Sequence, residues 1–274
     1  MRGGRTWSAI AVVLTTLGCV PPGPKLPVEH TEALRRTVHV GPPVDADISI
    51  LVAGDPTGTR VVLVHGTPGS ADSWADYLLA PPPGLEMVAL DRPGFGRSGP
   101  PGAVTSLASQ AAAVAALLPT DGRRAVLLGH SLGGPIVARV AAEHPDRVSA
   151  LVLLAASLDP DLEKIHPMQP VGTWWPVRSM LPRAIRNANA ELMALRPELV
   201  ELAGLLERVT APVVIVHGTA DGLVPVANVP FMQAHLVAAR CAETMLLPGA
   251  DHFLPWNSEA TVRAAIGWAA SAPC

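Results

Sequence analysis

The chain has 274 residues, of which 49% are hydrophobic and 16% are charged. This balance excludes an intrinsically disordered chain and allows a sizeable buried core, in one large domain or two small ones. The formal net charge of −3 excludes a broad basic face of the kind that binds nucleic acid, so we expect no nucleic-acid partner.

The N-terminus has the pattern of an export signal. Arg2 and Arg5 precede a short apolar run over residues 7–17. A run of about 11 residues is shorter than the ~20 helical residues that cross a bilayer, which indicates a targeting segment rather than an anchor helix. The run ends in the letters TLGC at residues 16–19, which resemble the lipobox of bacterial lipoproteins, whose cysteine is acylated and becomes the mature N-terminus.

This resemblance implies an exported protein that is anchored to a bacterial membrane through a lipid on Cys19, with no other membrane contact. Threonine stands three places before the cysteine, where the lipobox usually has leucine, and a soluble exported protein and an uncleaved cytosolic N-terminus remain alternatives. Residues 20–37 are rich in proline and lack hydrophobic periodicity, which predicts an extended tether. The tether would join the signal segment of residues 1–19 to a domain of residues 38–274.

Short apolar runs alternate with amphipathic segments from about residue 38 onward. Several runs are continuously apolar, as is typical of parallel strands that helices cover on both faces. The alternation predicts an α/β fold with a mostly parallel sheet and right-handed crossovers. The expected strands cover residues 47–52, 60–65, 86–90, 125–129, 150–155, 213–217 and 244–247, and the expected helices cover residues 71–79, 106–118, 132–143, 226–238 and 259–270.

One long insertion interrupts the alternation between residues 155 and 213. It contains the letters WWP at residues 174–176 and a helical pattern over residues 182–208. An insertion at this place lies over the carboxyl ends of the strands, where α/β proteins hold their sites. We therefore predict a small helical cap over about residues 158–208.

A serine between glycines gives the strongest chemical signal. The letters GHSLG at residues 129–133 directly follow an apolar run and begin a helical pattern. A G-x-S-x-G sequence at a strand-to-helix turn holds its serine in a strained, exposed conformation, and its glycines avoid collisions with the neighbouring strand and helix. This setting indicates that Ser131 is a nucleophile rather than an incidental residue of a glycine-rich turn.

A serine hydroxyl reacts well only when a base takes its proton, and the base needs a partner that holds its tautomer. Asp221 and His252 each follow an apolar run, which places both at the carboxyl ends of strands. The order Ser131, Asp221, His252 is the chain order described for α/β-hydrolases. Asp159 and Asp161 follow the strand at residues 150–155 and are the alternative acid.

On these motifs the chain is identified as a member of the α/β-hydrolase superfamily over about residues 48–270. The resemblance implies an eight-stranded, mostly parallel sheet flanked by helices. It also implies three roles: Ser131 is the nucleophile, His252 is the general base, and Asp221 is the acid that orients the base.

Two further motifs fit the same resemblance. The letters HGTPG at residues 65–69 match the family's H-G-x-P-G motif, which implies that the backbone N–H groups of Thr67 and Leu132 stabilise the developing oxyanion. The letters DRPGFGRS at residues 91–98 resemble the family's D-x-x-G-x-G-x-S loop and are expected to shape the cleft wall. The family pattern makes packing or turn residues of three histidines that flank glycines, namely His65, His130 and His217.

The serine nucleophile decides the class of reaction. Haloalkane dehalogenases and epoxide hydrolases of this fold carry aspartate at this position, so serine favours attack on an acyl carbon, most simply that of a carboxylic ester. The alternatives are acyl transfer to a non-water acceptor, peracid formation by a cofactor-free perhydrolase, and a non-catalytic binding protein on the same fold. We expect a small acyl compound as partner and neither a metal nor another cofactor, because no group of His, Asp and Glu has ligand spacing.

Tryptophan side chains in and around the expected cap are candidates for an apolar substrate pocket. The alternative is that they pack the cap onto the body of the domain. The candidates are Trp74, Trp174, Trp175 and Trp256.

Two cysteines, Cys241 and Cys274, lie in the expected domain. In an exported protein both would be in a compartment that permits disulfides. The alternatives are a bridge, which needs Cα atoms within about 7 Å, and a buried Cys241 with a free terminal thiol. No C-x-x-C pair is present, so the cysteines carry no zinc or redox signature.

Overall fold

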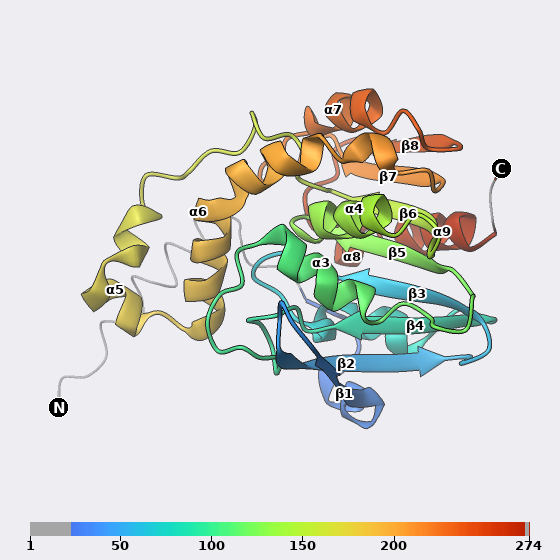
Figure 1. Ribbon diagram of the computed structural model, residues 1–274, viewed down its shortest axis with the longest axis horizontal. Coiled ribbons are helices and arrows are strands. Elements are labelled where there is room, and N and C mark those ends of the chain that lie inside the picture. Colours follow the sequence, from blue (N-terminus) through green and yellow to red (C-terminus); the bar gives the residue numbers. More distant parts are fainter. Residues whose placement is uncertain (1–22, 272–273) are drawn as a thin grey trace.

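A central sheet with helices on both faces forms the body of the molecule (Figure 1). The computed structural model describes residues 23–271 and residue 274. In this part of the chain, eight strands pair in the order β1-β2-β4-β3-β5-β6-β7-β8. The strands are β1 (Arg35–Val40), β2 (Ala46–Gly54), β3 (Thr59–Val64), β4 (Leu85–Leu90), β5 (Ala125–His130), β6 (Val148–Leu154), β7 (Val213–Gly218) and β8 (Ala242–Leu247).

The sheet is mostly parallel, as predicted. β2 runs antiparallel to its neighbours β1 and β4, and every other neighbouring pair is parallel. The eight-stranded α/β fold expected from the sequence is therefore confirmed. The helices of the body are α2 (Ala75–Leu79), α3 (Leu107–Ala115), α4 (Gly133–Glu143), α7 (Asn228–His235), α8 (Leu254–Asn257) and α9 (Glu259–Ala270), with a 3-10 turn η2 (Ala71–Trp74) before α2.

The start of the described chain differs from the expected tether. Val28–Leu34 form a 3-10 helix, η1, and β1 begins at Arg35, whereas we predicted an extended linker up to residue 37. The Arg35 guanidinium binds the carboxylates of Asp72 at 2.9 Å and buried Asp91 at 3.2 Å, which ties β1 to the body. This short edge strand has the sequence RRTVHV and buries only Val40, so it lacks the continuous apolar run by which we recognised the central strands. The predicted signal segment, residues 1–19, lies outside the described residues.

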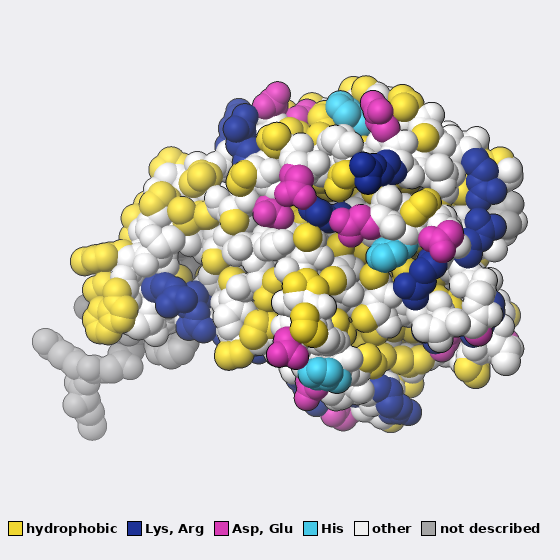
Figure 2. Space-filling view, in the orientation of Figure 1, with side chains coloured by type: hydrophobic (Ala, Val, Ile, Leu, Met, Phe, Trp, Pro, Cys, Tyr) yellow, Lys and Arg dark blue, Asp and Glu magenta, His cyan; other side chains and the backbone are white. Residues whose placement is uncertain are grey.

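The chain between β6 and β7 leaves the sheet and forms the helical part at the left of Figure 1, which we call the cap. This part contains η3 (Pro170–Thr173), α5 (Trp175–Met180), α6 (Arg183–Ala203) and η4 (Leu206–Arg208). The long helix α6 buries one face, whereas α5 buries none of its residues. Figure 2 shows hydrophobic side chains gathered at the far end of this part. None of the helices that the structure describes is both long and apolar enough to cross a bilayer.

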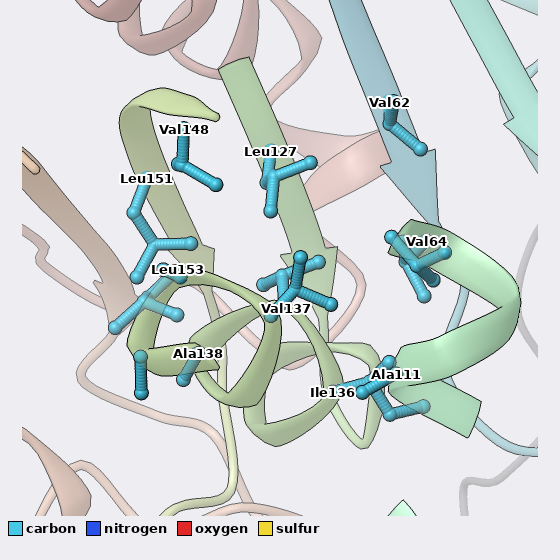
Figure 3. Packing of buried hydrophobic residues seen from close by; sticks show 14 of the residues in the cluster. Val62, Val64, Ala111, Leu127, Ile136, Val137, Ala138, Val148, Leu151 and Leu153 are labelled. Carbon is cyan, nitrogen blue, oxygen red and sulfur yellow. The ribbon is translucent and has the colours of Figure 1, made fainter. Parts of the chain in front are cut away.

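The central strands are buried on both faces of the sheet. In β5, Ala125 and Leu127 join one apolar cluster, and Val126 and Leu128 join the other. Helices α3, α4 and α7 contribute to the first cluster, and α2 and α9 contribute to the second. Figure 3 shows α4 on the first face, with Val137 close to Leu127. This burial explains why the sequence of β5 is continuously apolar.

A disulfide joins Cys241, just before β8, to Cys274 at the C-terminal end. Their Cα atoms are 6.4 Å apart, and the bridge links positions 33 residues apart in sequence. The structure thus decides between the two alternatives that the sequence leaves open. The closed loop contains β8, α8 and α9, so the bridge restrains the C-terminal part of the fold.

Replacing Cys241 and Cys274 together by serine is expected to lower the free energy of unfolding by about 3–4 kcal/mol, because the unfolded chain gains the entropy of an open loop. For a chain of this size the melting temperature should fall by about 2–4 °C per kcal/mol. Thermal unfolding of the oxidised protein and the double variant measures the difference. Reduced wild-type protein is the control and should melt with the variant, and equal melting temperatures of variant and oxidised protein would contradict the prediction.

Candidate active site

Ser131 lies in the turn between β5 and α4. Its φ of +56° is in the left-handed region, which residues other than glycine rarely adopt. Two backbone hydrogen bonds hold the turn: the Ser131 N–H donates to Leu154 O at 3.0 Å, and the Gly134 N–H donates to Ser131 O at 2.9 Å. The side chain remains partly exposed at the carboxyl edge of the sheet. Such strained positions cluster at functional sites.

The turn lies directly against the loop that follows β3. A Cβ at Gly133 would overlap the carbonyl oxygen of Val64, so only glycine allows α4 to start this close to β3. A Cβ at Gly66 would lie 2.8 Å from the Cβ of Ser131. The two glycines therefore let the loop of residues 65–69 approach Ser131.

Asp221 and His252 meet beside this turn. Asp221 follows β7 and His252 follows β8, and the His252 Nδ1–H donates to Asp221 Oδ2 at 2.7 Å. The other carboxylate oxygen, Oδ1, accepts the N–H groups of Leu223 at 2.9 Å and Val224 at 2.8 Å. Burial alone would raise the pKa of Asp221, but these hydrogen bonds and the charge of His252 hold the pKa below its ordinary value. Ionised Asp221 keeps the His252 proton on Nδ1, which leaves Nε2 able to accept another proton.

His130 connects the serine turn to His252. The His130 Nε2–H donates to the backbone O of His252 at 3.0 Å, and the two rings lie 4.8 Å apart. Because His130 directly precedes Ser131, these contacts place the turn and His252 together. Among the described residues Ser131 Oγ makes no hydrogen bond to His252. Catalytic hydrogen bonds commonly tighten only when substrate binds.

The loop after β3 is held by the buried side chain of Arg92. The His65 Nδ1–H and the Arg92 Nη2–H both donate to Gly66 O, at 2.7 Å and 3.1 Å, and Arg92 Nε–H donates to His65 O at 3.0 Å. A trans peptide points its C=O and N–H in opposite directions, so these bonds also set the direction of the Thr67 N–H. Within the part of the chain that the structure describes, neither this N–H nor that of Leu132 has a protein acceptor.

Arg92 also joins this loop to the long helix of the cap. Its Nη1 and Nη2 bind the two carboxylate oxygens of Glu191 on α6, at 2.7 Å and 3.0 Å, and both side chains are buried. The Gln110 amide donates a third hydrogen bond to Glu191, at 3.0 Å. We expected residues 91–98 to shape the cleft wall. That expectation stays a prediction, and the structure shows that Arg92 links α6 to the backbone of residues 65–66, which the motif alone does not reveal.

Known proteins share this architecture. The sequence matches the model of a family described as alpha/beta hydrolase fold over residues 59–194. A non-heme chloroperoxidase of Streptomyces lividans is 33% identical over 231 residues, which cover 68% of this chain and 82% of that protein. The chain belongs to the alpha/beta hydrolase superfamily.

Two further proteins resemble this hydrolase. A pimeloyl-[acyl-carrier protein] methyl ester esterase of Edwardsiella ictaluri is 27% identical over 234 residues, which cover 70% of this chain and 85% of the esterase. The crystal structure of a monoacylglycerol lipase of Paleococcus ferrophilus has a TM-score of 0.68 at 23% identity and covers 82% of this chain and 99% of the lipase. The second likeness concerns the fold alone. The relatives named a chloroperoxidase and an esterase show that the hydrolase is an enzyme.

The four tryptophans predicted to line a pocket lie in three different places. Trp74 is 1% exposed and packs edge-on against Tyr77 in the core, so the prediction is wrong for this residue. Trp256 is buried and packs edge-on against His130, which keeps it beside the site. Trp174 and Trp175 are 65% and 76% exposed at the end of the cap, where neither packs the cap onto the body.

The alternative acids make other contacts. Asp161 pairs with Arg196 at 3.2 Å, and neither Asp159 nor Asp161 bonds to His252 in the described structure. The geometry of the hydrolase thus favours Asp221. In residues 23–271 and 274, no group of three or more His, Cys, Asp and Glu is placed to hold a metal ion.

Glu191→Gln is expected to destabilise the hydrolase by about 3–5 kcal/mol, because it leaves the buried Arg92 charge without its partner. Glu201→Gln on the same helix is the matched control. Glu201 binds Arg139 at 2.9 Å but is 60% exposed, so its loss should cost less than about 1 kcal/mol. Urea unfolding of both variants measures the difference, and equal midpoints would show that the buried pair does not hold the cap.

The stability of the hydrolase is expected to fall as the pH decreases below about 6.5. Burial lowers the pKa of His65 and His217 below the ordinary value, and burial together with the nearby His252 charge lowers that of His130 to about 3. The unfolded chain therefore binds protons that the folded chain does not, and each such proton contributes up to about 1.4 kcal/mol per pH unit.

Urea unfolding between pH 7 and pH 4 tests this dependence. His130→Gln keeps a donor for the carbonyl of His252 but removes one titrating group, so its stability should fall less steeply. The same slope in the variant and the wild type would contradict the assignment of a neutral, buried His130.

Proposed function

We propose that the hydrolase cleaves carboxylic esters through an acyl-enzyme on Ser131. The observation that carries the proposal is the 2.7 Å hydrogen bond between Asp221 and His252, formed beside the strained serine turn. In this scheme His252 Nε2 takes the proton of Ser131 Oγ as Oγ attacks the acyl carbon. Asp221 holds the reactive tautomer and stabilises the imidazolium that results.

The attack moves negative charge onto the carbonyl oxygen of the ester. The N–H groups of Thr67 and Leu132, which have no protein acceptor among the described residues, would bind this oxyanion. Such donors act mainly on the transition state, and one of them typically contributes 10²–10³-fold, or roughly 3–4 kcal/mol. His252 then gives its proton to the leaving alcohol. In the second half of the reaction His252 takes a proton from water as the water attacks the acyl-enzyme, and it returns that proton to Ser131 Oγ as the acid leaves.

The esterase of Edwardsiella ictaluri supports ester chemistry, because its name specifies a methyl ester substrate and it aligns with most of this chain. The relative of Streptomyces lividans supports a second candidate, since it is named a non-heme chloroperoxidase. This second candidate is peracid formation by a cofactor-free perhydrolase, in which hydrogen peroxide replaces water. It attacks the acyl-enzyme, takes the acyl group as a peracid and returns the proton to Ser131 Oγ.

We also propose that the enzyme is exported and carries a lipid on Cys19. The basic and apolar pattern of residues 1–19 supports export. The disulfide between Cys241 and Cys274 supports it independently, because such bridges persist in oxidising compartments.

The triad is tested with a panel of p-nitrophenyl esters of increasing chain length. Ser131→Ala should lower kcat by about 10⁴- to 10⁶-fold, because no other atom bonds to the acyl group. Asp221→Asn should lower kcat by about 10⁴-fold, because an amide favours the wrong tautomer of His252.

Asp159→Asn is the matched control, since it makes the same chemical change at the alternative acid, and it should stay within a few-fold of the wild type. Circular dichroism should show that all three variants are folded. Turnover by Ser131→Ala, or a large loss confined to Asp159→Asn, would refute this triad.

Product analysis separates hydrolysis from the second candidate. With a p-nitrophenyl ester alone, the proposal predicts the free acid as the acyl product. If added hydrogen peroxide diverts most of the acyl group to peracid at low millimolar concentration, the perhydrolase function is favoured instead. Ser131→Ala serves as the blank, because it should form neither product.

A further inference from the structure

The end of the cap presents an apolar surface to solvent. Of the twelve large hydrophobic side chains that are exposed in the described residues, six lie within residues 165–180. They come from the loop before η3, from η3 itself, from the residue that joins η3 to α5, and from α5, and we call them the cap tip. The cap tip consists of Ile165, Met168, Val171, Trp174, Trp175 and Met180.

This surface lies away from the body of the enzyme. Figure 1 shows α5 at the far end of the cap, and Figure 2 shows hydrophobic side chains gathered on the same protruding end. No side chain of α5 is buried. Isolated exposed hydrophobic residues are ordinary, but a contiguous group on a soluble surface marks a contact with another phase or molecule.

Unpaired positive charges surround the cap tip. Residues 164–186 contain four basic residues and no aspartate or glutamate. Arg183 donates to backbone carbonyls of the loop at residues 96–101. The side chains of Lys164, Arg178 and Arg186 have no hydrogen-bond or ion-pair partner within residues 23–271 and 274.

We propose that the cap tip docks on the surface of an anionic lipid bilayer, with Trp174 and Trp175 at the level of the headgroups. Tryptophan is enriched at membrane interfaces, because its ring is apolar and its N–H remains able to bond to water or headgroups. Apolar side chains that enter the interface and basic side chains that remain outside it act together on anionic membranes. The charge of the segment, which is positive throughout, complements such a surface.

A bilayer fits this surface better than a protein partner does. The apolar residues protrude instead of lining a groove, and lipid headgroups can rearrange around a protrusion (Figure 2). This contact is additional to the expected lipid on Cys19, and it does not depend on the ester chemistry proposed above.

The experiment uses the full chain with Cys19→Ser, so that no lipid on this residue contributes to binding. The probes are vesicles of phosphatidylcholine, with or without 30% phosphatidylglycerol, whose acyl chains carry bromine to quench tryptophan. Trp174→Phe with Trp175→Phe removes the two fluorophores and keeps apolar rings. Trp174→Ser with Trp175→Ser removes the apolar contact. Val200→Ser with Val237→Ser is the matched control, because both valines are exposed outside the cap tip.

The proposal predicts that anionic vesicles bind the protein and quench its tryptophan emission. The phenylalanine variant should still sediment with the vesicles but lose most of the quenching, and the serine variant should bind at least tenfold more weakly. Lys164→Gln with Arg178→Gln should reduce binding to that seen with pure phosphatidylcholine. The control pair should behave as the wild type, and urea unfolding should confirm that every variant is folded.

Three results would overturn the proposal. Unchanged quenching in the phenylalanine variant would show that other tryptophans, such as Trp7, meet the lipid. Equal binding of the serine variant and the control would show that the cap tip does not contribute. A dimer that forms without vesicles and is lost in the serine variant would assign the cap tip to a second copy of the chain.

Discussion

The close approach of the serine turn to the end of β3 is the constraint on which the site depends. Gly133 lets the start of α4 lie against the carbonyl of Val64, and Gly66 lets the next loop lie against Ser131. Ser131 can then keep its left-handed backbone with its side chain at the open edge of the sheet. The same approach places two unpaired N–H groups, on Thr67 and Leu132, in the loop and turn that meet there. The proposed nucleophile and the proposed oxyanion donors thus arise from one packing contact.

Two buried charged side chains connect this turn and this loop to other parts of the molecule. Asp221 stays ionised because His252 and two loop N–H groups compensate for its burial, and its hydrogen bond orients the His252 ring. Arg92 is compensated by Glu191 of α6, and its remaining donors hold the carbonyls of residues 65 and 66. The cap helix α6 is therefore connected through Arg92 to the loop that contains Thr67. A change in the packing of α6 would consequently move this loop.

Short sequence patterns predicted those features of the site that are formed by residues close together in the chain. The strand-to-helix setting of residues 129–133, and the loops with Asp221 and His252 after apolar strands, are such patterns. The sheet followed from continuously apolar runs. By contrast, β1 was not predicted, because this short edge strand buries only Val40 and has no continuous apolar run. The pairing of Arg92 with Glu191 joins residues 99 positions apart, which no periodicity records. Tryptophan identity likewise does not distinguish the core position of Trp74 from the exposed cap tip.

The central claim is that Ser131 is the nucleophile and that His252 and Asp221 activate it. Mass spectrometry after exposure to a fluorophosphonate probe tests this claim most directly, because the probe bonds to an activated serine without requiring knowledge of the substrate. We expect one adduct, on the peptide that contains Ser131, with labelling slowed by orders of magnitude in His252→Ala. An adduct on a different residue, or labelling of Ser131 at an unchanged rate in His252→Ala, would contradict it.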